Sequence, residues 1–231
     1  MRRHLVPCLS LLAVAACGGS VYMPSRVANF DPEGAAEIDD ADVAKAFAAK
    51  PQMGDRLNVA YFSFDPSKDA DVGKAVRAMP GVSSVYDIPA LEATGRHRFD
   101  DDAPSAAPLG MKKLRLLAAR AHCDLLVVVD YARKIEVTAN ALAVFDVLLV
   151  PAFFLPFRDV KVESAVDAFV VDVRNGYMYG HVSLSKEDVA RNRTIYQDDD
   201  AIATREWTAL AGELRGALVK LADAERDKAH A

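Results

Sequence analysis

The sequence has too few cysteines for a disulfide framework. It contains 3 in 231 residues, and two of them, Cys8 and Cys17, lie within the first twenty. Cys123 is then alone in the remainder, so an intramolecular disulfide there is excluded. The fold must be stabilised by a hydrophobic core, and a composition that is 52% hydrophobic allows one good-sized domain.

Motifs that mark common enzyme sites are also missing. We find no Gly-x-Gly-x-x-Gly, no phosphate-binding loop, no Gly-x-Ser-x-Gly and no Cys or His pair at metal-ligand spacing. His97 lies near the run 100–102 of three aspartates, but contiguous carboxylates in a loop cannot all turn toward one ion. His122 and Cys123 are adjacent, and neighbours at a helix end point in different directions, so Cys123 fits a buried apolar position better than a nucleophile. We therefore expect no catalytic residue, no metal and no cofactor.

Positive charge is in the minority. The chain has 28 Lys and Arg against 33 Asp and Glu, which gives a formal net charge of −5. A nucleic-acid partner is disfavoured, because an acidic surface repels the phosphate backbone.

The first residues have the pattern of a bacterial export signal. Arg2 and Arg3 precede an apolar run from Leu9 to Ala16, and small residues lead to Cys17. The apolar run is far shorter than the about 20 residues that span a bilayer, so we expect residues 1–16 to be removed.

The end of this leader, Val14-Ala15-Ala16-Cys17, resembles the lipobox of bacterial lipoproteins. In that family the thiol is alkylated by a diacylglyceryl group and the signal is cut before the cysteine. The resemblance implies a lipid anchor on Cys17, and Gly18 implies sorting to the outer membrane because inner-membrane retention often uses Asp there. The alternative is an ordinary secreted protein with a chance cysteine.

Beyond the leader, residues 17–34 contain Pro24 and Pro32 without periodicity, which predicts a lipidated tether.

Residues 35–231 are expected to form a single α/β domain. Apolar spacings predict helices at 38–47, 69–79 and 111–122, and strands at 57–64, 82–88 and 124–130. They also predict a hairpin of 160–173 with 177–184 around Asn175-Gly176. A final helix begins at 198–200, with the stripe Trp207, Leu210, Leu214, Ala217 and Leu221. The order predicts a mixed β-sheet with helices packed on it and a long C-terminal helix.

An apolar insertion at 141–157 interrupts this order. Asp146, Pro151 and Pro156 exclude a simple transmembrane helix there. Three surroundings stay open for it: the protein core, a subunit interface or lipid. The candidates for interface or membrane contact are Phe145, Leu148, Phe153, Phe154, Leu155 and Phe157.

Two further stretches carry a resemblance. Ala118-Ala-Arg-Ala-His-Cys-Asp-Leu-Leu-Val-Val-Val129 and Val166-Asp-Ala-Phe-Val-Val-Asp-Val-Arg-Asn-Gly176 resemble a pattern of envelope lipoproteins related to the curli-secretion lipoprotein and the amino-terminal domain of TolB. The arrangement is also similar to the rhombotarget lipoproteins. Because these families are scaffolds, pores or assembly factors, the resemblance implies no catalytic residue.

From the sequence we expect an outer-membrane lipoprotein whose domain faces the periplasm and acts as a non-enzymatic binding or assembly module. Its partners would be the membrane, through the lipid anchor, and an envelope protein or further copies of itself. The alternatives are an oligomeric secretion-channel or pore-associated subunit, and an enzyme of unrecognised class.

Overall fold

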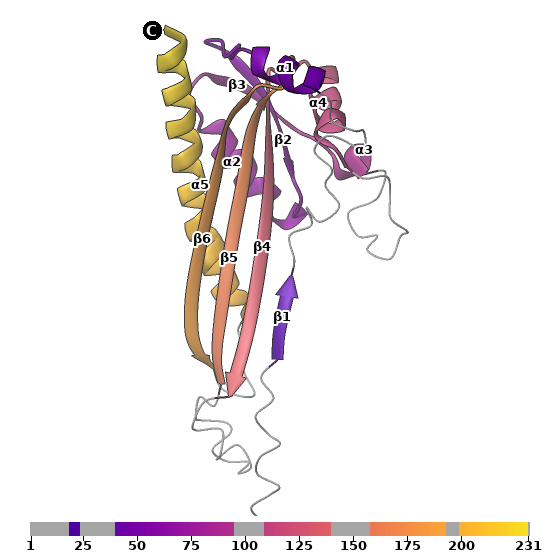
Figure 1. Cartoon of the computed structure of the whole chain (residues 1–231). Coiled ribbons are helices and arrows are strands. Elements are labelled where there is room, and N and C mark those ends of the chain that lie inside the picture. Colours follow the sequence, from indigo (N-terminus) through magenta and orange to yellow (C-terminus); the bar gives the residue numbers. More distant parts are fainter. Residues whose placement is uncertain (1–18, 24–39, 95–108, 140–157, 193–198, 231) are drawn as a thin grey trace, which may run out of the picture. The chain divides into compact units, whose positions relative to one another are not determined.

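The computed structural model describes residues 19–23, 40–94, 109–139, 158–192 and 199–230 (Figure 1). In chain order the elements are β1 (Gly19–Met23), α1 (Asp40–Ala48), β2 (Leu57–Ser63), the 3₁₀ helix η2 (Pro66–Lys68), α2 (Asp69–Arg77), β3 (Val82–Asp87), α3 (Ala90–Thr94), α4 (Met111–Arg120), β4 (Leu125–Ala139), β5 (Arg158–Asp172), β6 (Met178–Asn192) and α5 (Asp199–His230).

The strands form one mixed sheet in the order β3-β2-β4-β5-β6, with β1 paired to β4 beside this path. β2 is parallel to both β3 and β4, whereas β1 is antiparallel to β4. The predicted fold class, a mixed sheet with helices packed on it and a long C-terminal helix, is confirmed. β5 matches its predicted strand to within two residues at each end, whereas β4 and β6 extend well beyond the strands predicted from the sequence.

The chain groups into two compact units by its internal contacts. The described residues of unit 1 are 19–23, 133–139, 158–164, 185–192 and 199–208. Those of unit 2 are 40–94, 109–132, 165–184 and 209–230. β4, β5, β6 and α5 each contribute residues to both units.

In unit 2 the parallel strands are covered on both faces, as the near-continuous apolar run of β4 predicts. α2 packs on β2 and β3, with Val72 and Val76 fully buried. α4 covers the other face through Leu114 and Ala118. The cluster under α4 contains Ala60, Phe62, Ile88, Ala93, Leu109, Leu114, Leu117, Ala118, Cys123, Leu126, Val128 and Val173.

In unit 1 a small apolar cluster joins the sheet to the start of α5. Ile135 of β4 and Val160 and Val162 of β5 pack with Ile202 of α5. β1 pairs with Arg133–Val137 of β4, whereas β2 pairs with Leu125–Val129 of the same strand. Part of the predicted tether is therefore a strand, because β4 extends beyond its pairing with β2 and offers unpaired backbone groups there.

Two apolar stripes differ from their predicted form. On α5 the fully buried positions include Leu210, Leu214 and Leu218, whereas Ala217 and Leu221 are half-buried. The true stripe therefore follows steps of four after Leu210, which sequence spacing alone did not distinguish. No residue of α1 is buried, and its apolar residues Val43 and Phe47, which we expected from the spacing to face a core, are 59% and 93% exposed. Within the described residues, no helix is both long and apolar enough to cross a membrane.

Candidate functional site: a polar cavity in unit 2

A cavity of about 520 Å³ lies where the parallel strands of unit 2 begin. β2 begins at Leu57 and β4 at Leu125, and since they run parallel their first residues meet at one edge of the sheet. The turn that follows β5 reaches the same edge, because the backbone N–H of Val173 donates to the carbonyl of Asp124 at 3.0 Å. The lining residues are Asn58, Ala119, His122, Cys123, Asp124, Val173 and Arg174.

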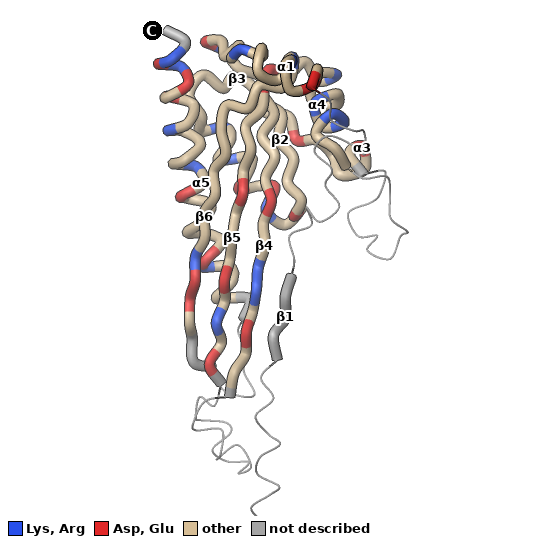
Figure 2. The backbone as a smooth tube through the Cα atoms, viewed as in Figure 1, with Lys and Arg blue, Asp and Glu red and all other residues tan. Residues whose placement is uncertain are grey.

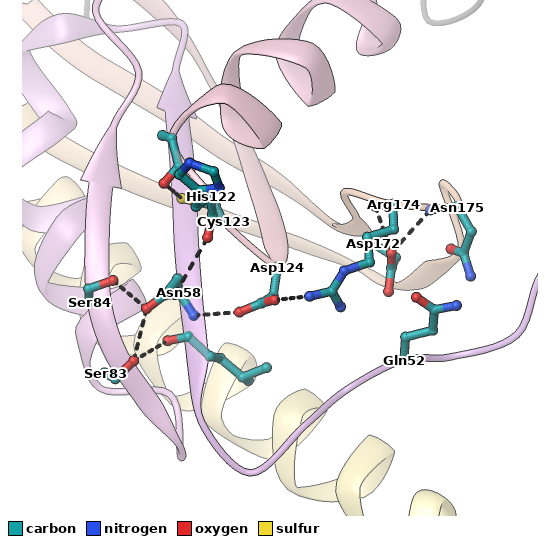
Figure 3. Close-up of polar contacts among 12 residues, drawn as sticks. Gln52, Asn58, Ser83, Ser84, His122, Cys123, Asp124, Asp172, Arg174 and Asn175 are labelled. Carbon is teal, nitrogen blue, oxygen red and sulfur yellow. Dashed lines mark hydrogen bonds and ion pairs between the residues drawn. The ribbon is translucent and has the colours of Figure 1, made fainter.

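Asp124 connects three of these segments (Figure 3). Its Oδ2 accepts a hydrogen bond from the backbone N–H of Asn58 at 3.0 Å, and its own N–H donates to the carbonyl of Asn58 at 2.7 Å. Its Oδ1 accepts from Nη2 of Arg174 at 2.5 Å. The Asp124 side chain is 19% exposed and that of Arg174 is 58% exposed. Solvent screens such a pair, so we regard it as a positioning contact more than a source of stability.

The side chain of Asn58 carries the network to β3. Its Oδ1 accepts from the hydroxyls of Ser83 at 3.0 Å and Ser84 at 2.7 Å. Ser83 also lies 3.1 Å from the carbonyl of Leu57. A hydroxyl has one proton, so Ser83 alternates between these two acceptors. The starts of β2 and β3 are thereby joined by side chains as well as by the backbone ladder.

The turn after β5 is held by the buried carboxylate of Asp172, which is 1% exposed. Its Oδ1 accepts from the N–H groups of Arg174 at 2.8 Å and Asn175 at 3.2 Å. Its Oδ2 accepts from the hydroxyl of Tyr179 at 3.0 Å. Burial raises the pKa of Tyr179 well above its ordinary value, and the hydrogen bond to Asp172 acts in the same direction. Gly176 completes the predicted turn with φ of 77°, a conformation that glycine adopts without cost.

Two neighbouring segments hold the same turn from outside. Arg115 of α4 donates from Nε and Nη2 to the carbonyl of Val173 at 3.2 and 3.1 Å. Asn175 donates from Nδ2 to the carbonyl of Lys50 at 2.6 Å. The segment after α1 is therefore fastened to the β5–β6 turn, and the exposed Arg174 is presented by a backbone fixed on both sides.

Cys123 and His122 complete the lining. His122 ends the α4 connection with φ of 55° and is exposed, whereas Cys123 is 7% exposed and belongs to the apolar cluster under α4. Burial, with the Asp124 carboxylate beside it, raises the pKa of the Cys123 thiol to about 11. The thiol is thus protonated at neutral pH, and its predicted role as a buried apolar residue is confirmed.

The site candidates named from the sequence lie outside the described residues. This holds for Cys17 and for Phe145, Leu148, Phe153, Phe154, Leu155 and Phe157. His97 and the aspartates at 100–102 also lie outside them. Among the described residues no group of three or more His, Cys, Asp or Glu side chains is placed to hold a metal ion.

The cavity itself was not predicted. Asp124 and Asn58 have one visible signal, a polar residue at the edge of an apolar strand, but nothing in the sequence says that the two strands begin side by side. Arg115 gave no signal, because one cation among several on a helix does not reveal which carbonyl it reaches.

Comparison with known proteins gives distant likenesses. No family model matches the chain, and no curated protein matches its sequence. Among solved structures, lipoprotein GNA1162 from Neisseria meningitidis is similar at 14% identity and a TM-score of 0.33, over 71% of this chain and 96% of that one. A nucleoside-triphosphatase, dITP/XTP pyrophosphatase, from Mycobacterium abscessus is similar at 14% identity and a TM-score of 0.26, over 68% of this chain and 99% of that one. At these TM-scores neither likeness carries an argument about activity.

Proposed function

We propose that the chain is an outer-membrane lipoprotein, held by acyl chains on Cys17, whose folded part is a non-enzymatic module that binds another envelope protein. The lipobox-like ending of the leader supports the anchor. The observation that carries binding is the polar cavity of unit 2, where the hydrogen-bonded turn after β5 presents Arg174 at 58% exposure.

The chemistry of the cavity suits recognition better than catalysis. The Asp124 carboxylate is occupied by Arg174 and by the N–H of Asn58, and the Cys123 thiol is neutral at physiological pH. A volume of about 520 Å³ is within the range of cavities that hold small ligands, so one or two side chains of a partner fit there. Because the walls are already fixed by hydrogen bonds, a partner is bound without the entropy cost of ordering them.

Site-specific photocrosslinking tests this function in cells. A photoreactive residue at Ala119, which is exposed and lines the cavity, is expected to give an adduct of discrete mass with an envelope protein. The same residue at Lys220, exposed on α5, serves as the matched control. Arg174→Glu should reduce the Ala119 adduct and Lys220→Glu should not. Equal adducts at both positions, or none at Ala119, would contradict binding at the cavity.

Two further measurements separate the parts of this proposal. Cys17→Ala should move the protein from the membrane to the soluble fraction, and full membrane retention would refute lipid as the main anchor. Light scattering of the lipidated protein in mild detergent gives its native mass. A discrete oligomer, together with an Ala119 adduct of twice the chain mass, would replace the envelope partner by a second copy.

A further inference from the structure

The exposed face of α4 is basic, although the chain as a whole is acidic. α4 contains Lys112, Lys113, Arg115 and Arg120 and no Asp or Glu, whereas the full chain has 28 basic against 33 acidic residues. Figure 2 shows blue residues and no red ones on α4. Three of these side chains are exposed, and the fourth, Arg115, bonds the carbonyl of Val173 in the turn after β5. The positive charge of α4 therefore lies mainly on its solvent side.

This basic face leads into the cavity of unit 2. Residues seven apart on a helix lie on one face, so Lys112 and the cavity-lining Ala119 form a row about 10.5 Å long. Lys113 and Arg120 form a neighbouring row with the same spacing. Leu116, between the ends of these rows, is 52% exposed. An extended chain of about three or four residues has the same length, so a peptide that lies along α4 reaches the cavity.

Arg174 provides the end point of this path inside the cavity. Its Nη2 donates to Asp124, but a guanidinium carries five N–H donors and this side chain is 58% exposed. The ion pair thus holds the group in place and leaves further donors facing solvent. Two such donors match the two oxygens of a carboxylate, which they bind by parallel hydrogen bonds. A carboxylate is therefore the group that this side of the cavity fits.

We propose that the partner of the cavity binds through an acidic segment, which lies along Lys112 and Lys113 on α4 and places one carboxylate against Arg174. This proposal rests on the proposed function and adds the chemistry of the ligand to it. Complementary charge draws an acidic segment to this face despite the net negative charge of the chain. A peptide is favoured over a layer of anionic lipid headgroups, because an extended chain can follow α4 and turn one side chain into a concave site, whereas a flat layer reaches the helix alone.

A fluorescein-labelled heptapeptide of glutamate tests this chemistry, with a heptapeptide of glutamine as the neutral control. The lipidated full-length protein, in an uncharged mild detergent, is titrated into each peptide and binding is followed by fluorescence anisotropy. At about 0.1 M salt the glutamate peptide should bind at least about ten-fold more tightly than the glutamine peptide, and about 0.5 M salt should weaken it by screening. Equal binding of the two peptides, or binding of neither, overturns the proposal.

Charge reversal locates the binding on the protein. Lys112→Glu together with Lys113→Glu should weaken binding of the glutamate peptide at least about five-fold. Both positions are exposed in the first turn of α4, where acidic residues interact favourably with the helix N-terminus, so the fold is retained. Arg215→Glu together with Lys220→Glu makes the same charge change at exposed positions of α5, and should alter the affinity by less than about two-fold because salt screens remote charges. Equal losses in the two double variants would show that net charge alone acts, which contradicts a site on α4.

The photoadduct at Ala119 separates this proposal from the proposed function. Mass spectrometry should place the crosslink in a segment of the partner where acidic residues outnumber basic ones. A crosslink in a neutral or basic segment overturns the acidic chemistry and leaves binding at the cavity intact, and an adduct with phospholipid replaces the peptide by a headgroup layer. Absence of any adduct contradicts the proposed function, whereas the peptide titration still decides whether this face binds an acidic segment.

Discussion

Replacing Asp172 by Asn should destabilise unit 2 more than any other isosteric change at the cavity. The carboxylate is 1% exposed and accepts three hydrogen bonds, from the N–H groups of Arg174 and Asn175 and from the hydroxyl of Tyr179. An amide keeps one acceptor oxygen for the two N–H groups. The amide nitrogen is a donor, so it cannot accept the proton of the Tyr179 hydroxyl as the carboxylate does. The oxygen of that hydroxyl already accepts from the N–H of Gln52 at 2.8 Å.

The magnitude follows from these contacts. A hydrogen bond to a charged group contributes about 1.5–3 kcal/mol, and the variant loses one such bond and the charge on the other two. We expect Asp172→Asn to lower the free energy of unfolding by about 2–3 kcal/mol. With a urea m-value of about 2 kcal/mol per M, the unfolding midpoint falls by roughly 1 M or more.

Urea unfolding followed by circular dichroism measures this change. Asp167→Asn is the matched control, because Asp167 lies on the same strand with a side chain 40% exposed and paired with His181 at 3.0 Å. Surface changes of that kind shift stability by about 0.5 kcal/mol or less. If the two variants unfold within about 0.5 kcal/mol of each other, the hydrogen bonds of Asp172 do not hold the turn, and the argument that this turn presents Arg174 on a fixed backbone fails.

Three further predictions concern other positions. Gly176→Ala should destabilise the protein by about 1–2 kcal/mol in the same assay, because φ is 77° and the new Cβ would lie 2.7 Å from the side chain of Arg115. Gly212→Ala, with open space around it on α5, should instead stabilise the protein by up to about 1 kcal/mol. Equal effects of the two substitutions would contradict this reasoning. Cys123, with a thiol pKa of about 11 against an ordinary 9.0, should react with maleimide about 100-fold more slowly at pH 8 than after unfolding in urea, and equal rates would show that the thiol is accessible. Glu206 is 4% exposed, and burial raises its pKa although the hydroxyl of Ser164 donates to it at 2.6 Å. The folded state therefore retains its proton to higher pH than the unfolded state, so stability falls as pH rises above the ordinary glutamate pKa of about 4.3. Glu206→Gln should accordingly stabilise the protein at pH 7 and have a diminishing effect below pH 4, and a gain that persists in acid would refute this cause.

Most of the fold could be predicted because its signals are local. The alternation of Val160, Val162 and Val166 on β5 identifies the buried face of that strand, and all three are fully buried. The Asn175-Gly176 pair identifies the hairpin turn, where Gly176 has the positive φ that such a turn requires. Both inferences depend only on residues within a few positions of each other, so no knowledge of the sheet order was needed.

The extra length of the strands had no comparable signal. Beyond Asp130, β4 continues through Lys134 and Glu136, which lie on a face with matched charges and are half-buried. Charged residues on one face lower strand propensity, and the pairing partner that compensates for this, β1, is more than a hundred residues away in the sequence. A short strand whose partner lies that far away in the sequence has the pattern of a tether, as residues 19–23 do.

The same reasoning explains why a lipid anchor can be predicted from sequence whereas this cavity cannot. A lipobox is a contiguous pattern, read by an enzyme from an unfolded chain, so its information is entirely local. Three of the residues that line the cavity come from different parts of the chain. Asn58 lies at the start of β2, Asp124 precedes β4, and Arg174 follows β5. Their proximity is a consequence of the parallel pairing of β2 with β4 and of the N–H of Val173 bonding to Asp124. Charge alone would have suggested an ion pair for Arg174 with any of 33 acidic residues, and only the sheet order selects Asp124.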